Sequence, residues 1–170
     1  MSISKIIFTF LFTFFSFSSL QSFTDNGKGA QSNGREDSSY LNIKNGNFKK
    51  GIDALKQATK YEKKNKVEKA NNRFEDALKY FILAYKEDPK NSEVLNYLGF
   101  GYYKIGDLIM SEIYYLEGLK IDPENNQINE RLGALYLASK RKNLAKERLN
   151  VLNSCNCQEF TNLKKIINEN

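Results

Sequence analysis

The sequence predicts an all-α protein: a short right-handed α-solenoid of about three helix-turn-helix repeats, closed by a C-terminal capping helix. Three observations lead to this prediction. Similar residues recur at an offset of 34 positions between residues 77 and 152. Within each copy the apolar residues follow the spacing of one helix face. Finally, Pro89 and Pro123 lie where second helices would end, because proline lacks the N–H and disfavours a helical residue before it.

The composition is that of an ordinary globular domain without histidine. Of 170 residues, 41% are hydrophobic and 27% are charged, which is enough apolar material for a core. The absence of histidine excludes Ser/His and Cys/His nucleophile pairs, histidine-ligated metals and the usual imidazole base. We therefore expect no enzyme, no cofactor and no metal site. The net charge of +6 is a mild, dispersed excess that does not indicate a nucleic-acid partner.

Residues 1–22 have the layout of a secretory signal peptide. Lys5 precedes an apolar run at residues 6–17, and a short polar stretch follows at residues 18–22. The apolar run is shorter than the roughly 20 residues that a helix needs to cross a bilayer. We therefore expect cleavage and export to the periplasm or the medium. An uncleaved segment that tethers the protein to the inner membrane is the alternative.

The rest of the chain divides by composition into a linker and a repeat domain. Residues 23–47 are rich in Gly, Asn, Ser and Asp, and are expected to form a flexible linker. The repeat domain is expected at residues 48–170, with repeats at about 48–91, 92–125 and 126–157 and a cap at 158–170. Within the cap, Phe160, Leu163, Ile166 and Ile167 share one helix face. A terminal repeat needs such a cap because its stacking face is otherwise exposed.

The 34-residue offset aligns small, aromatic and leucine positions across the copies. In the second helices it aligns three sets, Ala77/Ser111/Ala145, Phe81/Tyr115/Leu149 and Ala84/Gly118/Leu152. In the first helices it aligns Leu98 with Leu132, Gly99 with Gly133 and Tyr102 with Tyr136, while Ala58 and Tyr61 take the small and aromatic positions of a lengthened first repeat. All of these residues are expected to pack between helices. Gly99 and Gly133 are expected where the first helix of a pair closely approaches the second, which a missing Cβ permits.

This pattern resembles the tetratricopeptide repeat (TPR), whose signature places Leu-Gly, Tyr, Ala, an aromatic, a small residue and Pro at these spacings. The resemblance implies a non-catalytic scaffold that binds a peptide or helix of a protein partner in a concave groove. Because Cys-Asn-Cys precedes an acidic residue and an aromatic, the C-terminus is similar to those of some bacterial cell-envelope members. Export to the envelope agrees with the predicted signal peptide.

In the TPR family the concave surface comes from the first helix of each repeat. Carried over by position, the expected groove comprises Glu93, Asn96, Phe100, Tyr103, Lys104, Gln127, Glu130 and Leu137. Phe100 and Tyr103 are the expected anchors, unless they pack against a neighbouring repeat instead. Some members hold the C-terminal carboxylate of a chaperone with a clamp of Lys, Asn and Arg. At the clamp positions this chain has Leu55, Thr59, Tyr97, Gln127 and Arg131, so only the arginine fits.

Cys155 and Cys157 leave three interpretations open. In an exported protein they are expected to form a small structural disulfide, to remain as two buried thiols, or to act as a reactive redox pair. A thiol-disulfide redox protein is accordingly the alternative function, and a membrane-tethered assembly factor is a further one. Zinc is not expected, because a structural site needs four ligands.

A basic stretch is expected at the turn of the first repeat, with Glu62, Glu68 and Glu75 interleaved. It consists of Lys60, Lys63, Lys64, Lys66, Lys69 and Arg73. We expect a solvated face with ion pairs between residues four apart. A patch for acidic proteins or anionic lipid headgroups is the alternative.

Overall fold

The computed structural model describes residues 38–169, which form helices and contain no β-strand. The elements are α1 (Ser38–Glu62), α2 (Val67–Glu87), α3 (Ser92–Lys104), α4 (Leu108–Ile121), α5 (Asn126–Ala138), α6 (Lys142–Val151), the 3-10 helix η1 (Leu152–Ser154) and α7 (Gln158–Glu169). The chain divides into two units, Met1–Gly34 and Arg35–Asn170, and only the second contains described residues. The predicted signal peptide, residues 1–22, lies outside the described residues, as does residue 170.

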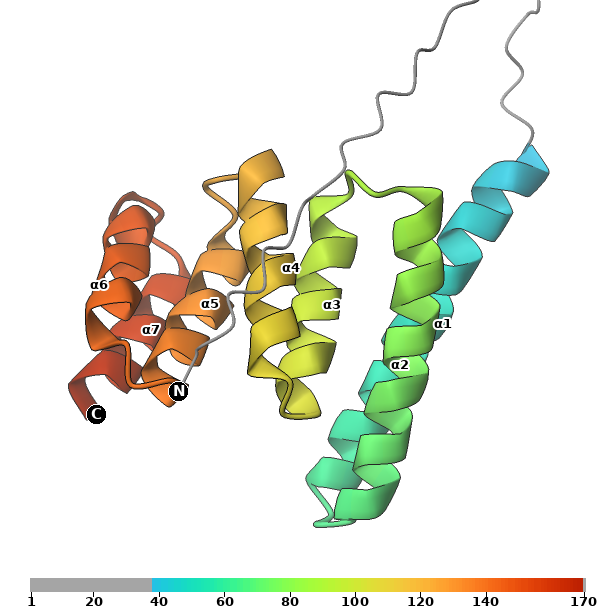
Figure 1. The fold of residues 1–170 in the computed structure, drawn as a ribbon, viewed down its shortest axis with the longest axis horizontal. Helices are drawn as coiled ribbons and strands as arrows, with labels where there is room; N and C mark the ends of the chain where they lie inside the picture. Colours follow the sequence, from blue (N-terminus) through green and yellow to red (C-terminus); the bar gives the residue numbers. More distant parts are fainter. Residues whose placement is uncertain (1–37, 170) are drawn as a thin grey trace, which may run out of the picture. The chain divides into compact units, whose positions relative to one another are not determined.

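The helices pack as three consecutive hairpins followed by a single helix (Figure 1). The pairs α1/α2, α3/α4 and α5/α6 form the hairpins, and α2 against α3 and α4 against α5 join each hairpin to the next. The last helix, α7, packs on both α5 and α6. The predicted all-α solenoid of helix-turn-helix repeats with a C-terminal cap is therefore confirmed.

Side-chain caps and prolines mark the helix ends. The side chains of Asn91, Asp107 and Asn125 accept hydrogen bonds from backbone N–H groups in the first turns of α3, α4 and α5. Such caps satisfy donors that have no partner within the helix. At the other ends, α2 and α4 stop just before Pro89 and Pro123. Asn91 and Asn125 are 34 residues apart, as are Pro89 and Pro123, so the same end signals recur in the second and third hairpins.

The first helix begins earlier than the sequence predicts. Because α1 starts at Ser38, the predicted flexible linker at residues 23–47 is wrong over residues 38–47. Extending a helix adds one backbone hydrogen bond for each residue fixed, whereas starting one is costly. The packed part of α1, which lies against α2, provides the start, and the helix continues into the polar segment. The remainder of the predicted linker, residues 23–37, lies outside the described residues.

Most of the positions that the repeat aligns lie in the core. Those that are buried are Ala58, Ala77, Phe81, Ala84, Leu98, Gly99, Ser111, Tyr115, Gly118, Leu132, Gly133, Tyr136, Ala145 and Leu152, and those that are half-buried are Tyr61, Tyr102 and Leu149. Tyr115 is the bulkiest fully buried side chain among the described residues. Burial raises the pKa of its phenol above the ordinary value.

One of the two predicted close approaches occurs elsewhere. A Cβ built on Gly99 would lie 2.5 Å from the ring of Tyr115 in α4, the second helix of the same repeat, as expected. A Cβ on Gly133 would instead lie 2.6 Å from Leu163 in α7, so that prediction is wrong. The residue 34 positions after Tyr115 is Leu149, whose side chain is shorter. Leu163 of the capping helix therefore occupies the space beside Gly133, as Tyr115 occupies the space beside Gly99 in the preceding repeat.

The turns inside the three hairpins share one backbone conformation. Gly106 has a φ of 86° after α3, and Lys140, 34 positions later, has a φ of 60° after α5. Asn65, after α1, has a φ of 54°. Glycine adopts this left-handed region freely and asparagine readily, whereas other residues lose about 1 to 2 kcal/mol. Lys140 is therefore the strained member of the set.

Lys140→Gly is expected to raise the free energy of unfolding by up to about 1 kcal/mol, because the relief of strain outweighs the added chain entropy of glycine. Urea unfolding followed by circular dichroism measures the change. Lys146→Gly, at an exposed position inside α6, is the matched control and should lower the free energy of unfolding by about 1 kcal/mol. Equal losses in the two variants would contradict the strained turn.

Candidate protein-binding groove

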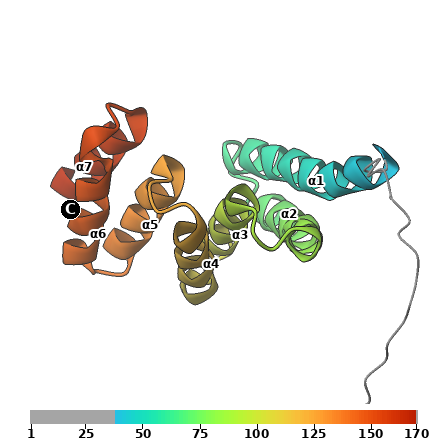
Figure 2. The same cartoon turned by 90° about the horizontal axis from the view of Figure 1, so that it is seen from above.

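The first helices of the hairpins form one side of the repeat array. Figure 2 shows α1, α3 and α5 along this side and α2, α4 and α6 along the other. We call the surface made by α1, α3 and α5 the inner face. Side-chain hydrogen bonds cross it between successive first helices, from α1 to α3 and from α3 to α5. The predicted groove residues on α3 and α5 belong to these two inner helices.

A polar network joins α3 and α5 at the centre of the inner face. The amide of Asn96, which is buried, donates to Gln127 Oε1 at 3.0 Å and accepts from Arg131 Nη1 at 2.9 Å. The Arg131 guanidinium also lies 4.7 Å from the ring centroid of Phe100 and 5.5 Å from that of Tyr97. The Arg131 guanidinium is therefore held in place by contacts within the protein.

Some of the remaining predicted groove residues contact other parts of the protein, and the others are exposed to solvent. Lys104 pairs with Glu62 of α1 and lies over the rings of Phe74 and Phe100. Glu130 accepts a hydrogen bond from Asn162 of α7. Phe100, Tyr103 and Leu137 are half-buried against core clusters, Glu93 is exposed at the start of α3, and Gln127 is exposed at the start of α5. The two expected anchors, Phe100 and Tyr103, thus pack between repeats.

The apolar hollow of the inner face lies closer to the N-terminal end than the sequence predicts. A pocket of about 510 Å³ lies between α1 and α3 and is lined by Ile52, Leu55, Lys56, Thr59, Lys60, Lys63, Lys64 and Tyr97. We call this cavity the lysine-ringed pocket. Ile52, Leu55 and Tyr97 supply its apolar surface, and all three pack on the core of the first two repeats. The Thr59 hydroxyl donates to the Leu55 carbonyl at 3.0 Å.

The spacing of residues along α1 could have indicated this pocket, although the repeat signature does not include these residues. Ile52, Lys56 and Lys60 follow one another at intervals of four, so they lie on one stripe of α1, and Lys64 lies in the turn just after this helix. The repeat signature assigns no role to these positions. Tyr97 stands at one of the positions that the family resemblance assigns to the clamp, and an aromatic ring cannot act as a clamp residue there.

The basic stretch at the first turn does not form the ion pairs that its spacing predicts. Within residues 38–169, Lys60, Lys63 and Lys64 make no ion pair, and Glu62 pairs with Lys104 on another helix. Arg73 pairs with Asp76 at 3.1 Å, three residues away. The expected pairs between residues four apart are therefore wrong for this stretch. Surface pairs of this kind contribute little, so spacing alone does not decide which of them form.

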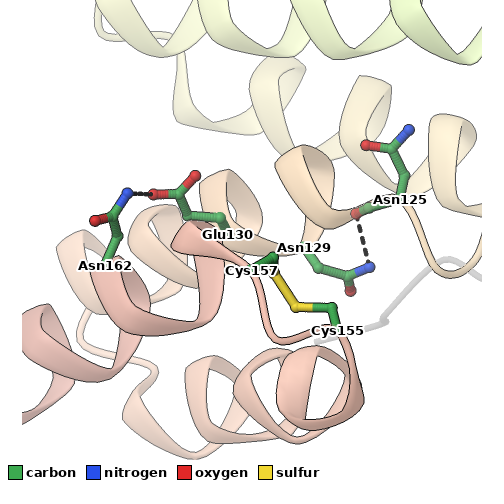
Figure 3. The surroundings of a disulfide bond; sticks show 6 residues. All are labelled: Asn125, Asn129, Glu130, Cys155, Cys157 and Asn162. Atoms are coloured by element: carbon green, nitrogen blue, oxygen red, sulfur yellow. Dashed lines mark hydrogen bonds between the residues drawn. A yellow bond between two sulfur atoms is a disulfide. The ribbon is translucent and has the colours of Figure 1, made fainter.

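Cys155 and Cys157 are joined by a disulfide at the start of the capping helix (Figure 3). Their Cα atoms lie 5.1 Å apart, and both residues are half-buried against the C-terminal core cluster. The interpretation as two free buried thiols is therefore wrong. Nearby, the amide of Asn162 donates to Glu130 at 2.8 Å, which ties α7 to α5. The disulfide and this hydrogen bond hold the cap beside the third repeat.

The described residues contain neither a metal-binding cluster nor a membrane-spanning helix. Residues 38–169 contain no cluster of three or more Cys, Asp or Glu side chains arranged to hold a metal ion. None of the described helices has both the length and the hydropathy needed to span a bilayer. The Arg141 guanidinium donates two hydrogen bonds to the Glu112 carboxylate, and this contact raises the pKa of Arg141 further above its ordinary value. That pair links α4 to the turn before α6.

Comparison with protein-family models and with curated proteins gives no match. Solved structures do match. The first TPR domain of Spaghetti (RPAP3), bound to an HSP90 peptide, is 19% identical over 72% of this chain and 93% of that chain, with a TM-score of 0.53. The second TPR domain of human RPAP3, in complex with an HSP70 peptide, is 15% identical over 75% and 99%, with a TM-score of 0.55. The TPR2B domain of yeast Sti1 is 14% identical over 71% and 94%, with a TM-score of 0.55. The described part of this chain therefore has the tetratricopeptide-repeat fold.

Proposed function

We propose that this protein is a non-catalytic interaction scaffold that binds a peptide or helix of a partner protein on its inner face. The observation that carries the proposal is the lysine-ringed pocket, an apolar hollow on the face where this fold presents its first helices. Pockets of several hundred Å³ with apolar walls and a few polar groups are typical ligand sites. The RPAP3 domains of the same fold are in complex with HSP90 and HSP70 peptides, which supports a peptide ligand.

The partner is proposed to differ from those chaperone tails in how it is held. Of the positions that clamp a terminal carboxylate, this chain has only one fitting residue, Arg131, and that side chain is bound to Asn96. We further propose, from the layout of residues 1–22, that the scaffold acts in the bacterial cell envelope after export. Retention of that segment as an inner-membrane tether is the alternative, and an intact mass of the native protein distinguishes the two.

Photocrosslinking in cells tests the binding face. A photoreactive amino acid is placed at Thr59 or Gln127 on the inner face, and at Glu75 or Leu116, which are exposed on α2 and α4, as matched controls. We expect crosslinks to one protein partner from the inner positions and none from the controls. Crosslinks from the control positions alone would contradict the proposal and place the interface on the second helices.

A further inference from the structure

We propose that the lysine-ringed pocket binds an acidic internal segment of the partner, with one large apolar side chain in the pocket and flanking Asp or Glu side chains on the lysines. The inference rests on the proposed function and adds the chemistry of the ligand. It draws on the shape of the pocket, the state of the lysines around it, and the state of the other cations on the inner face.

The apolar part of the pocket is preformed. The ring of Tyr97 stacks on Phe81, with centroids 5.3 Å apart and an interplanar angle of 20°, and meets Phe48 edge-on at 5.5 Å. Phe81 is fully buried, so this stack holds Tyr97 in place from beneath. Ile52 and Leu55 pack on the same core cluster. A side chain that enters the pocket therefore meets fixed walls, which lowers the ordering cost of binding.

The lysines around the pocket lie at the C-terminal end of α1 and in the turn that follows it. Lys56 and Lys60 are one helical turn apart on α1, Lys63 and Lys64 lie in the turn, and all four are exposed. Among the described residues, Lys60, Lys63 and Lys64 have no acidic partner. Lys56 lies 3.9 Å from Asp53, but both side chains are more than half exposed, so this pair is weak. The ammonium groups thus remain open to carboxylates of a ligand.

Two other cations of the inner face, Lys104 and Arg131, make contacts within the protein. Lys104 pairs with Glu62 and lies 5.2 Å from the ring centroid of Phe74. Arg131 donates to the Asn96 amide oxygen, and its guanidinium lies 4.7 Å from the ring centroid of Phe100. These two side chains are held by contacts within the protein, whereas several exposed lysines with no acidic partner among the described residues surround the pocket. Electrostatic complementarity then favours an acidic ligand there.

An internal segment fits this site better than a chain terminus. At the two clamp positions on α1, Leu55 has no donor and the Thr59 hydroxyl donates to a backbone carbonyl. Tyr97 replaces the third clamp residue and packs as part of the wall. The lysines are separate, flexible point charges, which suit several carboxylates along a segment more than one carboxylate held by two donors.

A peptide also fits this site better than a membrane. Proteins that bind a bilayer surface project apolar side chains beyond their basic residues, so that these side chains enter the acyl region. Here the order is reversed, because Ile52, Leu55 and Tyr97 are half-buried while the surrounding lysines are exposed. Only a projecting apolar side chain of the ligand reaches the pocket walls.

Peptide binding to the full chain tests the inference. The probes are fluorescein-labelled, C-terminally amidated peptides with a central Leu, Ile, Phe or Met flanked on each side by two acidic residues, read by fluorescence anisotropy. At least one is expected to bind, and replacement of its central residue by Ser should weaken binding about tenfold. A free C-terminal carboxylate should change the affinity by less than about threefold, because no clamp receives it.

The matched protein variants are Lys60→Glu/Lys63→Glu at the pocket and Lys142→Glu/Lys146→Glu on α6, which carry the same change of net charge. The pocket variant should bind the acidic peptide about tenfold or more weakly, and the α6 variant within about threefold of wild type. Thermal unfolding of both variants verifies that they are folded. Because the substituted lysines are exposed, we expect little change in stability.

Three results would overturn the inference. They are absence of binding by every peptide at about 1 mM, equal weakening by the two double variants, and binding only of free-acid peptides. If the protein binds phosphatidylserine vesicles but no peptide, and the pocket variant loses this vesicle binding, the lysines bind a lipid surface instead. If Thr59 and Gln127 crosslink to a partner but no acidic peptide binds, only this inference is overturned. If the inner-face positions give no crosslinks, the proposed function is overturned.

Discussion

Gly99→Ala is expected to lower the free energy of unfolding by about 2 kcal/mol, although alanine favours helix by about 1 kcal/mol at an unconstrained position. The added Cβ would lie 2.5 Å from two atoms of the Tyr115 ring, well inside van der Waals contact. Tyr115 is only 1% exposed, so its ring has no free space into which to move. The helices α3 and α4 must therefore separate or the ring must leave its rotamer. Urea unfolding followed by circular dichroism measures the loss.

Gly46→Ala is the matched control for this effect. Gly46 also lies inside a helix, α1, but a Cβ built there has no atom within 4 Å. The same substitution should leave the free energy of unfolding unchanged or raise it by up to about 1 kcal/mol. If the two variants are equally stable, the close approach of α3 and α4 at Gly99 is refuted, and with it the register of the second repeat.

The fold was predictable because the same packing problem recurs at a fixed spacing. Gly99 accommodates Tyr115, and Leu98 and Tyr115 are both buried. Many positions 34 residues apart carry similar residues, such as Leu98 and Leu132, because successive hairpins stack in the same way. The turns repeat as well, as the shared backbone conformation of Gly106 and Lys140 shows. Local chemistry and periodicity therefore predict the same hairpins.

The parts that escaped prediction depend on contacts outside the repeat. The approach of Leu163 to Gly133 involves the cap, which has no counterpart in the earlier repeats. Likewise, Glu62 pairs with Lys104 on another helix rather than with a lysine on its own, and surface pairs differ by too little energy for spacing to predict the partner. The extension of α1 to Ser38 follows from helix propagation and not from an apolar pattern.

The candidate groove was predicted in part. Asn96, Phe100 and Lys104 lie on the inner face as their helix positions imply, but they are engaged in contacts within the protein. The position of a residue in the repeat predicts which face it occupies, because the helix register determines the direction of each side chain. Whether a polar group is open to a ligand depends on its neighbours on the next helix. The lysine-ringed pocket became visible only once α1 and Tyr97 of α3 were placed together.

Leu163→Ala is expected to lower the free energy of unfolding by about 3 kcal/mol. Leu163 is fully buried between α7 and α5, and removing a buried leucine side chain leaves a cavity that the surroundings only partly close. The loss should be greatest at the C-terminal end, where α7 covers the third repeat. Hydrogen exchange should therefore show faster opening of α5 and α7 amides than of α1 and α2 amides.

The pair Leu163 and Gly133 allows a stricter test of the capping contact. Gly133→Ala alone should also destabilise, because its Cβ would lie 2.6 Å from Leu163 Cδ2. In the double variant the new methyl group occupies part of the cavity left by Leu163→Ala, so the free energy of unfolding should exceed the additive value by about 1 kcal/mol or more. Leu163→Ala combined with Gly46→Ala should be additive, since Gly46 lies on α1 and α7 packs on α5 and α6. Additivity in both pairs would mean that α7 does not cap the third repeat through Gly133, and that the space beside this glycine is filled by some other side chain.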